Sequence, residues 1–79
     1  MAIRVYLAAT LRRYLPGYDA AVGHEMAVEK GVSVRDVARE LGLNEDEVKL
    51  LMVDGIGAKW ETKLEGNERV AFFPPVGGG

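Results

Sequence analysis

The chain has 79 residues and a formal net charge of −2; 48% of its residues are hydrophobic and 28% are charged. These values are typical of one small globular domain with a single core. The small net charge gives no electrostatic reason to expect nucleic acid or an anionic membrane as a partner. No apolar run approaches the roughly 20 residues that a membrane span requires. The sequence therefore favours a cytoplasmic protein.

The chain has no cysteine and a single histidine, His24. The lack of cysteine excludes a disulfide, a thiolate nucleophile and a cysteine-ligated metal. One histidine is also a poor basis for a zinc site or a Ser-His-Asp triad. We interpret His24 as a surface or sheet-face residue. Arg12-Arg13, the one adjacent basic pair, is interpreted as a solvated loop pair, with pairing to a partner's carboxylates as the alternative. We expect no bound cofactor and no catalytic side chain.

The first part of the chain has the pattern of two paired strands. Apolar and other residues alternate over residues 3–8, which predicts a half-buried strand. Residues 10–15 are interpreted as a helical turn. Alternation returns over residues 22–29 and predicts a second strand, paired with the first as a hairpin with a long loop.

A helix is the best-marked element in the middle of the chain. Ser33 followed by Asp36 forms a capping-box pattern, and Gly42 is typical of a helix C-terminus. Four apolar residues between them share the i, i+3, i+4, i+7 spacing of one buried helix face: Val34, Val37, Ala38 and Leu41. Asn44 with Glu47 suggests a second, shorter helical turn.

The second half of the chain has the pattern of three more strands. Residues 50–53 are apolar and precede Asp54-Gly55, which is typical of a hairpin turn. The return strand is predicted over residues 58–61, with Trp60 as a half-buried cap on the sheet. Leu64 is expected to fill the core, and residues 69–73 form the last strand. One helix covers one face of a small sheet, so we expect an α+β mixed sheet of four to five strands wrapped around it, with the first and last strands adjacent and central.

The end of the chain carries the functional prediction. Pro74-Pro75 ends any strand pairing after residues 69–73, because proline has no N–H to donate. The glycines at 77–79 have backbone freedom and no side chains. We therefore divide the chain into a domain, residues 1–76, and a flexible glycine tail, residues 77–79, that presents a terminal carboxylate. The alternative is an inert, frayed terminus.

These features together resemble the MoaD/ThiS family of sulfur-carrier proteins. The resemblance covers essentially the whole chain: its strand and helix order, Val53-Asp54-Gly55 in the middle hairpin, and Phe72-Phe73-Pro74-Pro75-Val76 before the final glycines. Asp54 stands where the family usually has Asn, and Gly77 occupies a variable position. The resemblance implies the ubiquitin-like β-grasp fold.

The resemblance also implies a mechanism. An E1-like enzyme of the MoeB/ThiF type would use ATP to adenylate Gly79, and sulfur would then replace AMP to leave a thiocarboxylate. The sulfur would pass to a molybdopterin synthase large subunit of the MoaE type or to another acceptor. The Phe72-Phe73-Pro74-Pro75 run favours the molybdopterin pathway. Thiamine thiazole supply, conjugation to lysines and a non-covalent module with an inert tail stay open as alternatives.

Strand alternation separates the two phenylalanines before the tail. Phe72 is expected in the core and Phe73 on the outside, where an exposed aromatic beside a reactive tail suggests a docking site. The alternative is that Phe73 packs under the loop at residues 11–14. Leu51, Val53 and Ala8 are candidates to extend the exposed patch. The predicted site comprises Gly78 and Gly79 as the reacting end and Phe73, Pro74, Pro75, Val76 and Gly77 as partner-binding residues.

Overall fold

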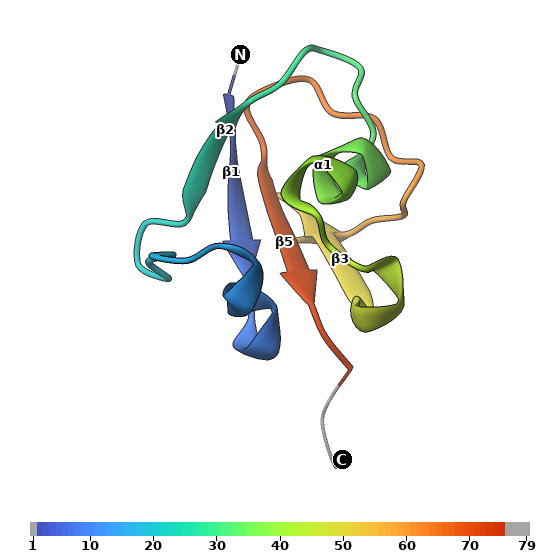
Figure 1. Cartoon of the computed structure of the whole chain (residues 1–79). Coiled ribbons are helices and arrows are strands. Elements are labelled where there is room, and N and C mark those ends of the chain that lie inside the picture. Colours follow the sequence, from blue (N-terminus) through green and yellow to red (C-terminus); the bar gives the residue numbers. More distant parts are fainter. Residues whose placement is uncertain (1, 76–79) are drawn as a thin grey trace.

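A computed structural model describes residues 2–75 of the chain (Figure 1). Its elements in order are β1 (Ala2–Leu7), the 3-10 helix η1 (Ala9–Tyr14), β2 (His24–Ala27), α1 (Val34–Leu41), the 3-10 helix η2 (Glu45–Glu47), β3 (Leu50–Val53), β4 (Ile56–Gly57) and β5 (Arg69–Phe73). Within residues 2–75, no helix is both long and apolar enough to cross a membrane.

The strands form one mixed sheet in the order β2-β1-β5-β3-β4. The first and last strands, β1 and β5, are parallel neighbours near its centre, and the other neighbouring pairs are antiparallel. Helix α1 lies across one face of the sheet (Figure 1). The expected mixed α+β architecture, with its central pair of strands, is confirmed.

The core lies between α1 and the inward-facing side chains of β1, β5 and β3. Every second residue of β1 and β5 is buried, as the alternation predicted. Leu64, in the long segment before β5, is fully buried and confirms its predicted role. The buried hydrophobic residues are Ile3, Val5, Leu7, Leu11, Val34, Val37, Ala38, Leu43, Leu51, Leu64, Val70 and Phe72.

Both ends of α1 are capped as the sequence predicted. The Ser33 hydroxyl oxygen accepts a hydrogen bond from the Asp36 backbone N–H at 3.1 Å, and the Asp36 carboxylate accepts one from the Ser33 N–H at 3.1 Å. These bonds, first of all the one from the Ser33 backbone, lower the pKa of Asp36 below its ordinary value. Gly42 has a φ of 78° at the C-terminus, a conformation that favours glycine.

The predicted return strand over residues 58–61 is wrong. Asp54 and Gly55 both have positive φ, as the hairpin turn requires, but the strand after them is only Ile56–Gly57. The chain then leaves the sheet, because the carbonyls of Trp60 and Thr62 accept hydrogen bonds from the first backbone N–H groups of α1. The second strand is also shorter than predicted, at residues 24–27 instead of 22–29.

Trp60 therefore caps the core from a turn and not from a strand. Its side chain is half-buried, and its ring centroid lies 6.2 Å from that of Phe72. The Arg35 guanidinium lies 5.9 Å from the same indole ring. The packing role predicted for Trp60 is confirmed although its element was wrong.

Candidate functional site

Strand β5, the central strand of the sheet, is the last element before the C-terminal residues of the chain. The Phe72 carbonyl accepts a hydrogen bond from the Ala8 N–H at 3.1 Å, and the Phe73 carbonyl accepts one from the Lys49 N–H at 2.7 Å. The chain is thus held from both sides up to Phe73, and the ladder ends at Pro74, as expected of a residue without an N–H. The short segment from the end of β5 to Pro75, which we call the chain exit, leads away from the sheet (Figure 1).

Phe72 and Phe73 face opposite sides of the sheet. Phe72 is fully buried, whereas Phe73 is half-buried and does not pack against the core. The outward position of Phe73 is confirmed. Arg12 of η1 borders the same hollow as Phe73, so packing against η1 stays open as the alternative to docking. The role of Phe73 in docking stays a prediction.

Phe73 belongs to an apolar surface on the face of the sheet opposite α1. Strand register places Leu50 beside Phe73, and places Tyr6 and Met52 on either side of Ala71. Ala8 follows β1 next to the end of β5. We call this surface the outer patch; its residues are Tyr6, Ala8, Leu50, Met52, Ala71 and Phe73.

Of the three residues predicted to extend the exposed patch around Phe73, two do not belong to it. Ala8 lies in it, but Leu51 is buried and Val53 packs against the core. Leu50 and Met52, which no sequence pattern singled out, belong to the patch instead. Leu51 is paired with the buried Phe72 and faces the core, so its neighbours Leu50 and Met52 face the other side of the sheet. Leu50 is 46% exposed and so leaves a large apolar side chain on the surface.

A shallow hollow borders the outer patch near Phe73. It lies between the patch and the loop after η1, and the Tyr18 ring forms part of its wall. The Tyr18 hydroxyl accepts a hydrogen bond from the Leu7 N–H at 3.0 Å, beyond the last residue of β1 that pairs with β2. No local sequence pattern marks Tyr18, because its partner is eleven residues away.

The two 3-10 helices are joined to each other close to the end of β5. The Arg13 guanidinium donates to the Glu47 carboxylate at 2.6 Å, and the Tyr14 hydroxyl donates to the same carboxylate. The Tyr14 bond, followed by the Arg13 bond, lowers the pKa of Glu47. Arg12 donates through Nε to the Leu7 carbonyl at 3.3 Å. Arg12 and Arg13 are both exposed, as interpreted, but both also make hydrogen bonds within the chain.

Of the predicted partner-binding residues, Phe73, Pro74 and Pro75 lie within the described part of the chain. Pro74 is half-buried and Pro75 is exposed, and both directly follow Phe73 of the outer patch in the chain. Val76, Gly77, Gly78 and Gly79 lie outside the described residues. The reacting end of the chain therefore stays a prediction.

No metal site is present in residues 2–75, where no three His, Asp or Glu side chains come close enough to hold an ion. His24 is half-buried on β2 and Glu45 pairs with Arg35 at 3.3 Å. Within residues 2–75, the candidate site therefore comprises the outer patch and the end of β5.

Comparison with known families identifies the group to which this arrangement belongs. The model of the ThiS family matches residues 6–79. The chain belongs to the ThiS family. The match includes the outer patch, β5 and the terminal glycines, so the resemblance inferred from the ending of the chain is confirmed. No curated protein matches the chain.

Solved structures support the same fold. A Pyrococcus furiosus protein described as molybdopterin converting factor subunit 1 has a TM-score of 0.72 at 25% identity, over 96% of this chain and 99% of that one. SAMP1 from Haloferax volcanii has a TM-score of 0.74 at 18% identity, over the full length of both chains. The Haloferax volcanii protein HVO 2177 has a TM-score of 0.75 at 23% identity, over 100% of this chain and 87% of that one. The ThiS-family chain therefore has the ubiquitin-like β-grasp fold that the sequence predicted.

Proposed function

We propose that the chain is a sulfur carrier whose terminal residue, Gly79, is activated by an E1-like enzyme and converted to a thiocarboxylate. The observation that carries this proposal is the ThiS-family match, which extends through Gly79. The structure supports it in a further way. β5 is anchored up to Phe73, beside the partly exposed outer patch, which would dock an enzyme while the residues after Pro75 enter its active site.

The proposed chemistry needs no catalytic side chain from this chain. A carboxylate is a poor electrophile at neutral pH, so its oxygen first attacks the α-phosphorus of ATP and pyrophosphate leaves. Hydrosulfide, or a sulfur donor at the same oxidation level, then attacks the carbonyl carbon of the acyl adenylate and AMP leaves. Glycine at position 79 leaves that carbon unhindered. ATP belongs to the activating enzyme, of MoeB or ThiF type, in this scheme.

We propose molybdopterin synthesis as the pathway served, with a large subunit of the MoaE type as the sulfur acceptor. The support is the likeness to the Pyrococcus furiosus protein described as a molybdopterin converting factor. Supply of sulfur to the thiamine thiazole is the alternative within the same chemistry. The likeness to small archaeal modifier protein 1 is one of fold, and it motivates conjugation to lysines as the candidate from another class.

The test is the intact mass of the full chain after incubation with ATP, an E1-like activating enzyme and a sulfide source. We expect an increase equal to the exchange of one oxygen for one sulfur. A chain lacking Gly78 and Gly79 should show no increase, and Gly79→Ala should react more slowly because its methyl group crowds the reacting carbon. An unchanged mass with several such enzymes would overturn the carrier proposal.

A second step separates the candidate uses of the activated chain. The thiocarboxylated protein is mixed with a large subunit of the MoaE type and the pterin precursor. Return of the mass to its starting value, dependent on both additions, supports the molybdopterin pathway. Covalent conjugates that form instead when ATP and activating enzyme are added to a lysate would support the modifier candidate.

A further inference from the structure

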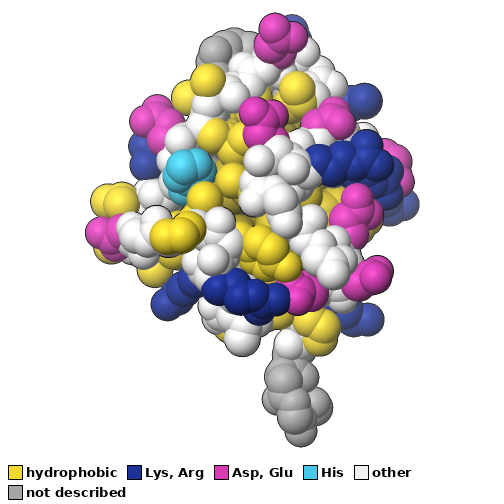
Figure 2. Space-filling view, in the orientation of Figure 1, with side chains coloured by type: hydrophobic (Ala, Val, Ile, Leu, Met, Phe, Trp, Pro, Cys, Tyr) yellow, Lys and Arg dark blue, Asp and Glu magenta, His cyan; other side chains and the backbone are white. Residues whose placement is uncertain are grey.

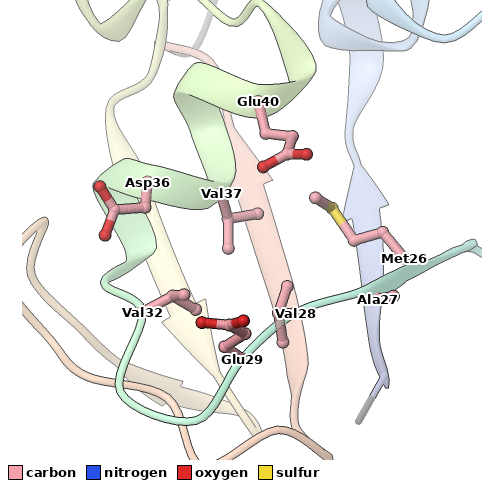
Figure 3. A pocket seen from close by; sticks show the side chains of 8 residues that line it. All are labelled: Met26, Ala27, Val28, Glu29, Val32, Asp36, Val37 and Glu40. Carbon is pink, nitrogen blue, oxygen red and sulfur yellow. The ribbon is translucent and has the colours of Figure 1, made fainter.

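A second apolar surface lies on the helix side of the sheet. A hollow of about 380 Å³ separates β2 and the loop after it from α1. Figure 3 shows Met26, Val28, Val32 and Val37 around this space, and Figure 2 shows hydrophobic side chains reaching the surface between β2 and α1. Its size is within the range of binding pockets. We call this hollow the acidic groove because of its rim.

The rim of the groove carries three carboxylates, those of Glu29, Asp36 and Glu40. Within residues 2–75, none of the three takes part in an ion pair, whereas Lys30, next to Glu29, is paired with Glu65. Asp36 is engaged in capping α1 and lies near Lys63 and Arg39. The uncompensated negative charge therefore belongs mainly to Glu29 and Glu40, which enter the hollow from the loop and the helix (Figure 3).

Strand β2 forms one wall of the groove and is also an edge of the sheet. It pairs with β1 on one side, and no strand in the described part of the chain pairs with its other side. An edge strand offers backbone N–H and C=O groups to an added strand. Met26 points to the groove from this strand because its partner in the register, Ile3, is a core residue.

We propose that the acidic groove binds an extended segment of a partner protein that has apolar residues at its centre and Lys or Arg at both ends. The segment would add a strand to the free edge of β2 and place alternate apolar side chains against Val28 and Val37. Its basic ends would meet Glu29 and Glu40. Strand addition of this kind takes affinity from backbone hydrogen bonds and specificity from pockets for alternate side chains.

The groove and the chain exit would be usable at the same time. β2 runs antiparallel to β1, so Ala27 and the loop after it lie beside Ala2, whereas the exit lies at the other end of β1, beyond Leu7. The groove is on the helix side and the outer patch on the opposite face. A segment bound in the groove would therefore leave β5 and the outer patch free.

The test is binding of a synthetic peptide with a central Val-Ile-Val-Ile run and Lys-Lys at each end to the full chain, followed by NMR. We expect amide shifts in residues 24–40 and slower hydrogen exchange on β2. Glu29→Lys and Glu40→Lys should each weaken binding by about tenfold, because like charges would then face each other. Asp46→Lys is the matched control, since it makes the same charge change at an exposed position in η2 and should bind normally.

Two altered peptides make the outcome decisive. Glu-Glu in place of Lys-Lys should abolish binding, and proline in the centre should weaken it by removing a backbone N–H. Equal binding of the Glu-flanked peptide would overturn the proposal, as would shifts confined to the outer patch or no binding of the Lys-flanked peptide. Unchanged binding by the proline peptide would overturn the strand-addition part.

Discussion

The outer patch and the acidic groove lie on opposite faces of one sheet and are built in different ways. The outer patch consists of uncharged side chains on or directly after β1, β5 and β3, whose ladders also hold the last residues before the exit. The groove lies between an edge strand and a helix, has carboxylates on its rim and includes a free strand edge. A surface held by continuous pairing suits a folded enzyme, whereas a free edge suits an extended segment. If both proposals hold, this domain has two kinds of docking surface that do not compete.

The largest expected effect is on stability, and it distinguishes the buried face of β5 from its outer face. Phe72→Ala should lower the free energy of unfolding by about 3–5 kcal/mol, because it empties a fully buried site. Phe73→Ala should change stability much less and instead weaken binding to the activating enzyme by about tenfold or more. Chemical unfolding and enzyme titration measure the two quantities. Equal losses of stability and binding in Phe73→Ala would show that its role is structural.

The next prediction compares one variant on each surface in both assays, thiocarboxylation and peptide binding. Leu50→Lys places a charge beside Phe73 at an exposed position, so it should slow thiocarboxylation at low enzyme concentration by about tenfold. The same variant should bind the Lys-flanked peptide normally, whereas Glu40→Lys should show the reverse pattern. Both quantities can be measured on the same preparations. If either variant lowered both, the two surfaces would be coupled and the comparison would fail.

A smaller effect concerns the turn that leads into β5. The buried Glu68 carboxylate accepts hydrogen bonds from the backbone N–H groups of Glu65, Gly66 and Asn67 at 2.6, 2.9 and 3.1 Å. Burial acts to raise the pKa of Glu68, but these bonds outweigh it and lower the pKa below the ordinary 4.5. The stabilisation is therefore present above that pH and lost as pH falls through the folded-state pKa.

Glu68→Gln tests this anchor. The variant should be less stable than the wild type near neutral pH, and its stability should fall less steeply in acid, because one titrating carboxylate is gone. Urea unfolding across the acid range measures both trends. Asp36→Asn is a useful comparison, since Asp36 also has a lowered pKa but belongs to the groove side. Parallel curves for wild type and Glu68→Gln would contradict the assignment.

The smallest effect concerns the helix that forms the other wall of the groove. Ser33→Ala removes the hydroxyl acceptor of the N-cap and should lower the free energy of unfolding by about 1 kcal/mol. Ser33→Thr keeps the acceptor and is the matched control. Peptide binding in the groove should weaken slightly, while thiocarboxylation stays unchanged. A stability equal to that of the wild type would mean that water replaces the cap without cost.

Features that depend on near neighbours in the chain were predicted well. Ser33, Asp36 and Gly42 act on backbone groups within a few residues, so the bounds of α1 could be read from the sequence. The turn at Asp54-Gly55 depends on the φ angles of two residues and was also correct. The return strand failed because the chain after β4 is held by hydrogen bonds to a helix more than twenty residues earlier, a competition that no local pattern records.

Local chemistry along the chain is enough to define where the last strand stops, which phenylalanine is buried and how α1 begins and ends. Proline lacks a donor, alternate side chains face opposite ways, and caps bond to adjacent turns. Which residues belong to the outer patch and to the acidic groove depends on the tertiary structure. Leu50 and Met52 join the outer patch only through the register of β3 on β5, and Glu29 and Glu40 border one groove only because α1 packs beside the edge strand. Those contacts join distant segments, and packing of the common core selects among the registers that the local patterns allow.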